Sequence, residues 1–112
     1  MKNIAQDFIT ISKTHDLGDI HLKKDVFNSI AVYACQEETR ALLDGRARQR
    51  VESKIIDNQL TLSLEVKLQY GQNVNEVSES LQNKIVQMIE HMTGFRCLAV
   101  EVRVVGFYFN AQ

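Results

Sequence analysis

The sequence predicts one α+β domain, in which a small mixed sheet carries two helices packed on one face. Residues 60–70 alternate strictly between apolar and polar side chains, which is typical of a strand with one buried face. Residues 74–92 repeat apolar side chains at steps of three and four, which is typical of an amphipathic helix. Residues 97–109 return to alternation, so we expect a second strand that the chain reaches by a right-handed crossover.

Length and composition fit a single soluble domain. The chain has 112 residues, of which 45% are hydrophobic and 24% charged, and its formal net charge is −1. That balance gives no overall attraction to nucleic acid or anionic lipid. The sequence contains neither an apolar run of the roughly 20 residues that span a bilayer nor a signal peptide in residues 1–12. We therefore expect a cytoplasmic protein without a membrane span, and the two separated cysteines fit a reducing compartment.

The N-terminal residues 1–16 are predicted to form a partly ordered arm, and residues 17–112 to form the domain. Ile4, Phe8 and Ile11 are spaced for one face of a helix, whereas the run from Phe8 to Ile11 equally fits a short strand. A segment that binds a partner is the sharper alternative, and we favour the arm.

The first half of the domain is predicted to contain a short extended segment at 18–22, a helix at 24–39 and a strand at 46–56. The apolar face of this helix consists of Val26, Phe27, Ile30, Ala31 and Ala34. In the strand, Val51 and Ile55 are expected to point into the core, and a polar turn follows it.

Cap and turn residues bound the elements of the second half. Asn73 is a candidate N-cap whose partner is Glu76, and Gly94 is expected to end the helix in the left-handed conformation. In the last strand, consecutive valines at 104 and 105 followed by Gly106 predict a bulge. The element order is therefore (β)αββαβ. The sheet face away from the helices is expected to meet solvent or a polar partner through Thr61, Ser63, Glu65, Lys67, Glu101 and Arg103.

No set of residues in the sequence matches a catalytic or cofactor site. Residues 15–21 include two histidines and two aspartates, which suggests a metal site, but polar residues are common in a loop beside a domain start, and we favour the loop. Cys35 and Cys97 lack the base that a nucleophilic cysteine needs, so we expect them to be buried hydrophobic side chains. The glycines are scattered and form no phosphate-binding loop. We expect no enzymatic activity, no cofactor and no metal.

Arg46, Arg48 and Arg50 are the first candidate group for binding a partner. They alternate along a predicted strand near Arg40, and together these arginines form the only local cluster of charge. Such a cluster can contact the phosphates of nucleic acid or lipid headgroups. In the interpretation that we favour, its positive charges instead keep an edge strand from pairing with other molecules.

Phe107, Tyr108 and Phe109 are the second candidate group. Three consecutive aromatic residues leave both faces of the last strand apolar at its end. They either cap the hydrophobic core or form an exposed surface for a partner, and the sequence leaves both alternatives open.

Several stretches of the chain, in their order and spacing, resemble one protein family. They are Gly18-Asp19-Ile20, Asp25-Val26-Phe27 with Ile30-Ala31, Val51 to Asn58 followed by Leu60 to Leu64, Gln69-Tyr70-Gly71, Met92-Thr93-Gly94-Phe95 and Val100 to Gly106. The family is the alkaline shock protein family, also called the envelope stress response family, of Gram-positive bacteria. Lys23 departs from the family pattern, which has a serine before the first helix, and the connection at 38–50 is unusually basic at its end.

The resemblance implies an α+β domain and a family without established enzymatic activity. It implies a cytoplasmic scaffold or interaction protein that self-associates, and some members are held at the inner face of the membrane by a separate anchor protein. Other members are encoded near genes of lipid metabolism, which implies a regulatory subunit of a lipid-metabolism enzyme as one alternative. A nucleic-acid-binding module that uses the three arginines is the other, although no aromatic RNA-binding motif accompanies them.

Overall fold

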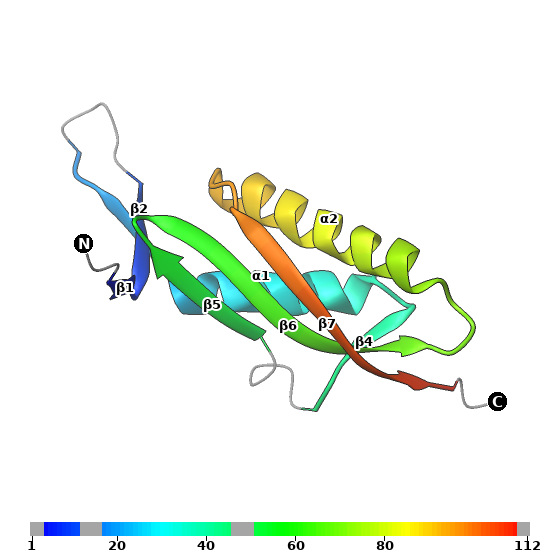
Figure 1. The fold of residues 1–112 in the computed structure, drawn as a ribbon. Coiled ribbons are helices and arrows are strands. Elements are labelled where there is room, and N and C mark those ends of the chain that lie inside the picture. Colours follow the sequence, from blue (N-terminus) through cyan, green and yellow to red (C-terminus); the bar gives the residue numbers. More distant parts are fainter. Residues whose placement is uncertain (1–3, 12–16, 46–50, 110–112) are drawn as a thin grey trace.

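The computed structural model describes residues 4–11, 17–45 and 51–109 (Figure 1). This part of the chain has two helices and a mixed sheet, which confirms the predicted α+β class. The elements in chain order are β1 (Ala5–Gln6), β2 (Phe8–Ile11), β3 (Ile20–Lys23), α1 (Lys24–Glu37), β4 (Ala41–Leu43), β5 (Val51–Ile56), β6 (Gln59–Gln69), α2 (Val74–Thr93) and β7 (Ala99–Tyr108).

Strand β6 is the centre of the main sheet, because strands pair along both of its edges. β7 runs parallel to β6 and pairs with residues 61–69, and α2 is the crossover that connects the two strands (Figure 1). Along the other edge of β6, two antiparallel strands pair one after the other. β5 pairs with residues 59–64, and β4 pairs with residues 66–68.

The hydrophobic core lies between one face of this sheet and the two helices. On β6 the inward side chains are at most 1% exposed, and they are Leu60, Leu62, Leu64, Val66 and Leu68. Helix α2 packs on them with Val77, Leu81, Ile85 and Ile89. Helix α1 packs with Phe27, Ile30, Ala31, Ala34 and Cys35. Each large apolar side chain buried here contributes roughly 1.5–3 kcal/mol before the entropic cost of ordering it.

The ends of α2 follow the predicted cap residues. The Asn73 side-chain oxygen accepts a hydrogen bond from the Glu76 backbone N–H at 3.0 Å, and Gly94 has a φ of 74°. Helix α1 starts differently, because Lys23 at its N-cap makes no side-chain cap hydrogen bond. The Lys24 backbone N–H instead donates to the Asp7 carbonyl at 3.1 Å, so the N-terminal segment satisfies one of the free amides of α1.

The N-terminal residues that the structure describes are strands and not a helix. β2 pairs antiparallel with β3, from Phe8 opposite Lys23 to Ile11 opposite Ile20, and the side chain of Ile9 is fully buried in the core. The strand alternative for residues 8–11 is therefore the one that the structure contains. The boundary that we predict between an arm at 1–16 and the domain at 17–112 stays a prediction.

Two further features complete the sheet. The bulge predicted in the last strand is confirmed, because Val66 pairs with Val104 and Lys67 pairs with Gly106, so that Val105 is skipped in the register. Strand β4 was not predicted, since three residues are too few to give a pattern. Of the strand predicted at 46–56, residues 46–50 lie outside the described part, and Val51 and Ile55 are buried as expected.

Candidate interaction surface

Three aromatic side chains lie together where β6 and β7 end. The ring of Tyr70 stacks on the ring of Phe109 with centroids 4.7 Å apart, and it meets the ring of Phe107 edge-on at 6.3 Å. Tyr70 is 63% exposed, Phe107 50% and Phe109 73%. We call these three residues the aromatic cluster. Exposed apolar side chains that gather in this way are typical of surfaces that bind partners.

The bulge at Val105 is what brings Phe107 and Phe109 to the same side of the sheet as Tyr70. Val104 faces the helices, and uninterrupted alternation would turn residues 106 and 108 to that side. Because one residue is skipped, Phe107 instead pairs with Leu68, whose side chain points to the helix side. We predicted that the strand at 60–70 buries one face, and for Tyr70 this was wrong, because Tyr70 follows the last residue of β6 and is exposed.

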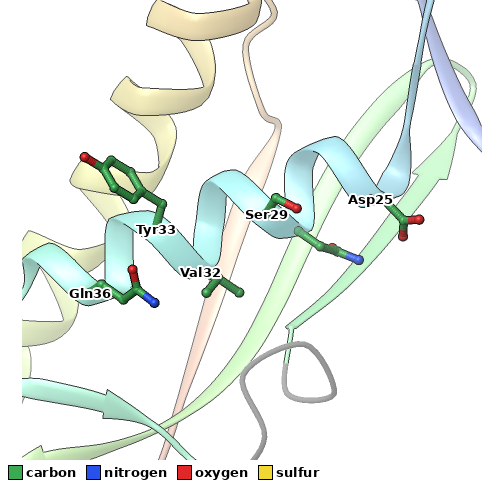
Figure 2. Close-up of a pocket in the computed structure, with 6 residues that line it drawn as sticks. Asp25, Ser29, Val32, Tyr33 and Gln36 are labelled. Carbon is green, nitrogen blue, oxygen red and sulfur yellow. The ribbon is translucent and has the colours of Figure 1, made fainter.

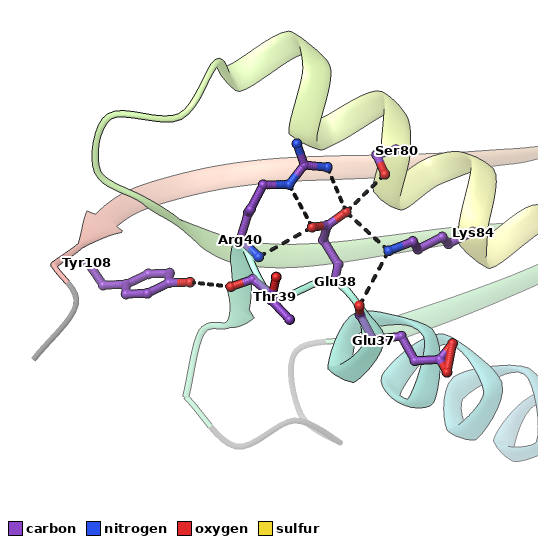
Figure 3. A network of polar contacts seen from close by, with 7 residues as sticks. All are labelled: Glu37, Glu38, Thr39, Arg40, Ser80, Lys84 and Tyr108. Atoms are coloured by element: carbon purple, nitrogen blue, oxygen red, sulfur yellow. Dashed lines mark hydrogen bonds and ion pairs between the residues drawn. The ribbon is translucent and has the colours of Figure 1, made fainter.

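Tyr108 has a different position from its two neighbours. Its side chain is half-buried, and its hydroxyl donates a hydrogen bond to the Thr39 carbonyl at 3.1 Å (Figure 3). Thr39 lies between α1 and β4, so Tyr108 fastens the end of β7 to the segment that follows the first helix. Of the three aromatic residues that the sequence analysis singled out, Phe107 and Phe109 thus belong to the cluster, and Tyr108 fixes the strand that carries them.

The predicted arginine cluster separates into two parts. Arg46, Arg48 and Arg50 lie outside the described residues, so their role in binding phosphates or protecting an edge stays a prediction. Arg40, which the sequence analysis grouped with them, forms an ion pair with Glu38, with its Nε 2.9 Å from the Glu38 Oε1. Its second bond runs from a terminal guanidinium nitrogen to Oε2 at 3.1 Å.

Glu38 is the centre of a polar network that joins α1, β4 and α2 (Figure 3). The side chain of Glu38 is only 3% exposed. Besides the two side-chain bonds from Arg40, its Oε1 accepts a bond from the Arg40 backbone N–H at 3.3 Å. Its Oε2 accepts a bond from the Ser80 hydroxyl at 2.9 Å and lies 3.4 Å from the Lys84 Nζ. The bond from Arg40, supported by Ser80 and Lys84, lowers the pKa of Glu38 from 4.5 to about 2, although burial alone would raise it.

The network is a structural device and not a catalytic centre. Both oxygens of the carboxylate accept bonds from donors that hold it ionised, and the lowered pKa makes Glu38 a weak base near neutral pH. No pattern in the sequence pointed to the contact with Ser80, because the two residues are 42 positions apart. The spacing of Glu38 and Arg40, two residues apart just after a predicted helix, was the one signal in the sequence for their ion pair.

A surface hollow of about 310 Å³ lies along the outer side of α1 (Figure 2). All of its lining residues come from this helix, and they are Asp25, Asn28, Ser29, Val32, Tyr33 and Gln36. The group contains one carboxylate, and no histidine, cysteine or lysine that would complete a nucleophile and its base. The hollow therefore has no reactive centre of its own.

The two cysteines are buried, as the sequence analysis predicted. Cys35 and Cys97 are each 4% exposed and are not joined by a disulfide. Burial raises the pKa of the Cys35 thiol to about 12, and it also raises the pKa of Cys97. His21 contacts the Thr10 hydroxyl at 3.1 Å through its Nδ1. Within residues 4–11, 17–45 and 51–109, no group of three or more potential ligands is placed to hold a metal ion.

A comparison with known families decides the membership of the chain. A sequence profile of the alkaline shock protein 23 family, which is described as having a cell envelope-related function, matches residues 38–109. The chain belongs to this family. No curated protein and no solved structure matches the chain significantly.

The alkaline shock protein match begins at Glu38 and ends at Phe109. It therefore contains the sheet from β4 to β7, helix α2, the aromatic cluster and the carboxylate of the polar network. In the part of this family member that the structure describes, no helix combines the length and the hydropathy that a membrane span needs. The function of this family is related to the cell envelope.

Proposed function

We propose that this protein is a non-enzymatic scaffold of the envelope stress response class. It self-associates through a strand edge or through the C-terminal aromatic strand, and a protein partner recruits it from the cytoplasm to the inner face of the membrane. The single observation that carries the proposal is the aromatic cluster. Phe107 and Phe109 expose half or more of their surface at the end of a strand, where a folded protein without a partner gains nothing from exposing them.

The chemistry of the domain supports a binding role over a reaction. The polar network holds its carboxylate ionised and enclosed, and both thiols are buried with raised pKa values. The charged residues on the open face of the sheet, such as Glu101 and Arg103, pair with each other at 2.9 Å. The aromatic cluster gathers three exposed apolar rings in mutual contact, and such a surface is of the kind that recognises protein.

Static light scattering of the complete chain over a wide concentration range tests self-association. We expect the weight-average mass to rise from that of a monomer toward a multiple of 12.8 kDa. A strict monomer at every concentration would contradict this part of the proposal.

Fractionation of cells that produce the tagged chain tests recruitment through the aromatic cluster. The double variant Phe107→Ser with Phe109→Ser should move from the envelope fraction to the soluble fraction, because exposed aromatic side chains dominate the affinity of many interfaces. Leu42→Ser is the matched control, since Leu42 is 54% exposed but lies on β4, at the opposite edge of β6. Recruitment by the aromatic cluster is refuted if the double variant and the control distribute alike.

A further inference from the structure

Strand β7 has an open edge in the part of the chain that the structure describes. It pairs with β6 on one side, and no described strand pairs with its other side. The Val100 carbonyl accepts a hydrogen bond from the Gln82 side chain of α2 at 3.0 Å, so it is satisfied by a side chain and not by a neighbouring strand. Lysine and proline, which often protect an edge, are absent from the strand sequence Ala99–Tyr108.

We propose that a second copy of this chain pairs with this edge, with the two β7 strands antiparallel and Val102 opposite Val102 of the partner subunit. The inference deepens the self-association part of the proposed function by naming the occupant, the strand and the register. A two-fold axis perpendicular to the sheet would pass beside Val102, and it would place the helix layers of both copies on the same side of one continuous sheet.

The alternation of β7 restricts the registers that this pairing can adopt. Val100, Val102 and Val104 face the helices, and Glu101 and Arg103 face the opposite side. A register that places a valine opposite a charged residue would turn the core face of one copy toward solvent, and it is excluded for that reason. The skipped residue Val105 marks the end of the regular part of the strand, so the pairing is centred on its first half.

The charges of β7 select one register among those that remain. With Val102 on the axis, Glu101 lies opposite Arg103 of the partner subunit, and this pair occurs twice. If the two-fold axis moves by one residue to position 101, Glu101 lies opposite Glu101 of the partner subunit. If it moves to position 103, Arg103 lies opposite Arg103 of the partner subunit. Like charges that face each other across strands are unfavourable, whereas opposite charges are favourable by roughly 0.2–1 kcal/mol. The side chains of Glu101 and Arg103 are 62% and 51% exposed, so both are accessible to a second strand.

The neighbouring flank of α2 is compatible with a close approach of two copies. Because Gln82 reaches the open edge of β7, residues spaced with it on the helix lie beside the same edge. Besides the buried Ile89, they are Asn75, Ser78, Val86 and Thr93, within about 40° of Gln82 on the helix circumference. None carries a charge, whereas Lys84 lies on the flank toward α1 and pairs with Glu38. Two uncharged flanks can therefore meet above the paired strands.

A charge-exchange experiment on the complete chain tests the register. Glu101→Arg alone places like charges at both cross-strand positions, and so does Arg103→Glu alone. Each single variant should dimerise roughly tenfold more weakly than the natural chain, as measured by sedimentation equilibrium. When the two variants are mixed, two arginines of one chain lie opposite two glutamates of the other, so native mass spectrometry should detect the mixed dimer in preference to either homodimer.

The mixing step separates contacts between chains from the ion pair of Glu101 and Arg103 within one chain. Preferential formation of the mixed dimer supports the register, because no effect inside a single chain can be repaired by another chain. If the single variants dimerise like the natural chain, the β7 interface is overturned while self-association through another surface stands. If they dimerise weakly but the mixture does not recover, the register is overturned. A natural chain that is monomeric throughout overturns both this inference and the self-association of the proposed function, and it leaves recruitment through the aromatic cluster to be judged separately.

Discussion

Removing the charge of Glu38 while keeping its shape should destabilise the domain in a pH-dependent way. In the folded state, hydrogen bonds from Arg40, supported by Ser80 and Lys84, lower the pKa of Glu38 from 4.5 to about 2. A difference of this size between the unfolded and folded states corresponds to about 3 kcal/mol in favour of the folded state at neutral pH. Arg40 and Lys84 are each about one third exposed, so solvent screens part of the attraction. We expect Glu38→Gln to lower the free energy of unfolding by about 2 kcal/mol near pH 7.

The sign of the pH dependence follows from the direction of the shift. Because the folded pKa is the lower one, the contribution of the carboxylate is complete above about pH 4.5 and is lost as the pH falls through about 2. The difference between the natural chain and Glu38→Gln should therefore shrink over that interval. Urea unfolding followed by circular dichroism at several pH values gives both free energies.

The neighbouring Glu37→Gln is the matched control for this experiment. The Glu37 side chain is exposed and points away from the network (Figure 3). Its backbone carbonyl accepts a hydrogen bond from the Lys84 Nζ at 3.4 Å, and the substitution leaves this carbonyl in place. This variant should change the free energy of unfolding by less than about 0.5 kcal/mol. A loss in Glu38→Gln that is the same at pH 7 and near pH 2, or an equal loss in Glu37→Gln, would refute the role given to the network.

Two further predictions concern the N-terminal strands and the buried thiol. Asn58 has a φ of 57°, accepts a bond from the Thr10 backbone N–H at 2.8 Å and donates one to the Thr10 carbonyl at 3.1 Å. Asn58→Gly keeps this φ without strain but loses both bonds, so it should lower the free energy of unfolding by about 1–2 kcal/mol. It should also speed hydrogen exchange at the Thr10 amide. An exchange rate equal to that of the control Asp57→Gly would contradict this. Because burial raises the pKa of Cys35 to about 12, this thiol should react with a disulfide reagent much more slowly at pH 8 in the folded protein than in urea. The thiol introduced by Tyr33→Cys on the exposed face of the same helix is the comparison, and equally fast native reaction of Cys35 would show that it is not enclosed.

Local patterns were sufficient for the second half of the domain. The alternation of 60–70 fixed which side chains of β6 are buried, because successive side chains of a strand point to opposite faces whatever surrounds them. The three- and four-residue steps of α2 and its Asn73 and Gly94 ends were predicted for the same reason, since they depend on a few adjacent residues. The pair Val104–Val105 before Gly106 likewise predicted the bulge, because a bulge interrupts the alternation within the strand itself.

Features that depend on distant residues could not be predicted. Whether residues 8–11 form a strand is decided by β3 and by the core that receives Ile9, and the sequence by itself allowed a helix as well. Strand β4 exists because the second half of β6 offers it an edge to pair with. The three residues of β4 carry too little pattern to be recognised alone.

The same division holds for the candidate surface. By itself, the sequence determined the fold class, the burial of β6 and α2, the family resemblance and the presence of the aromatic residues 107–109. Each of these depends on patterns among residues that are close together in the sequence. Only the tertiary structure decided that Tyr70 joins Phe107 and Phe109 in the open, that Tyr108 turns away to Thr39, and that Arg40 is held by Glu38. The physical reason is that exposure depends on where the helices stop covering the sheet, and that a buried carboxylate is stable only when donors from several elements converge on it.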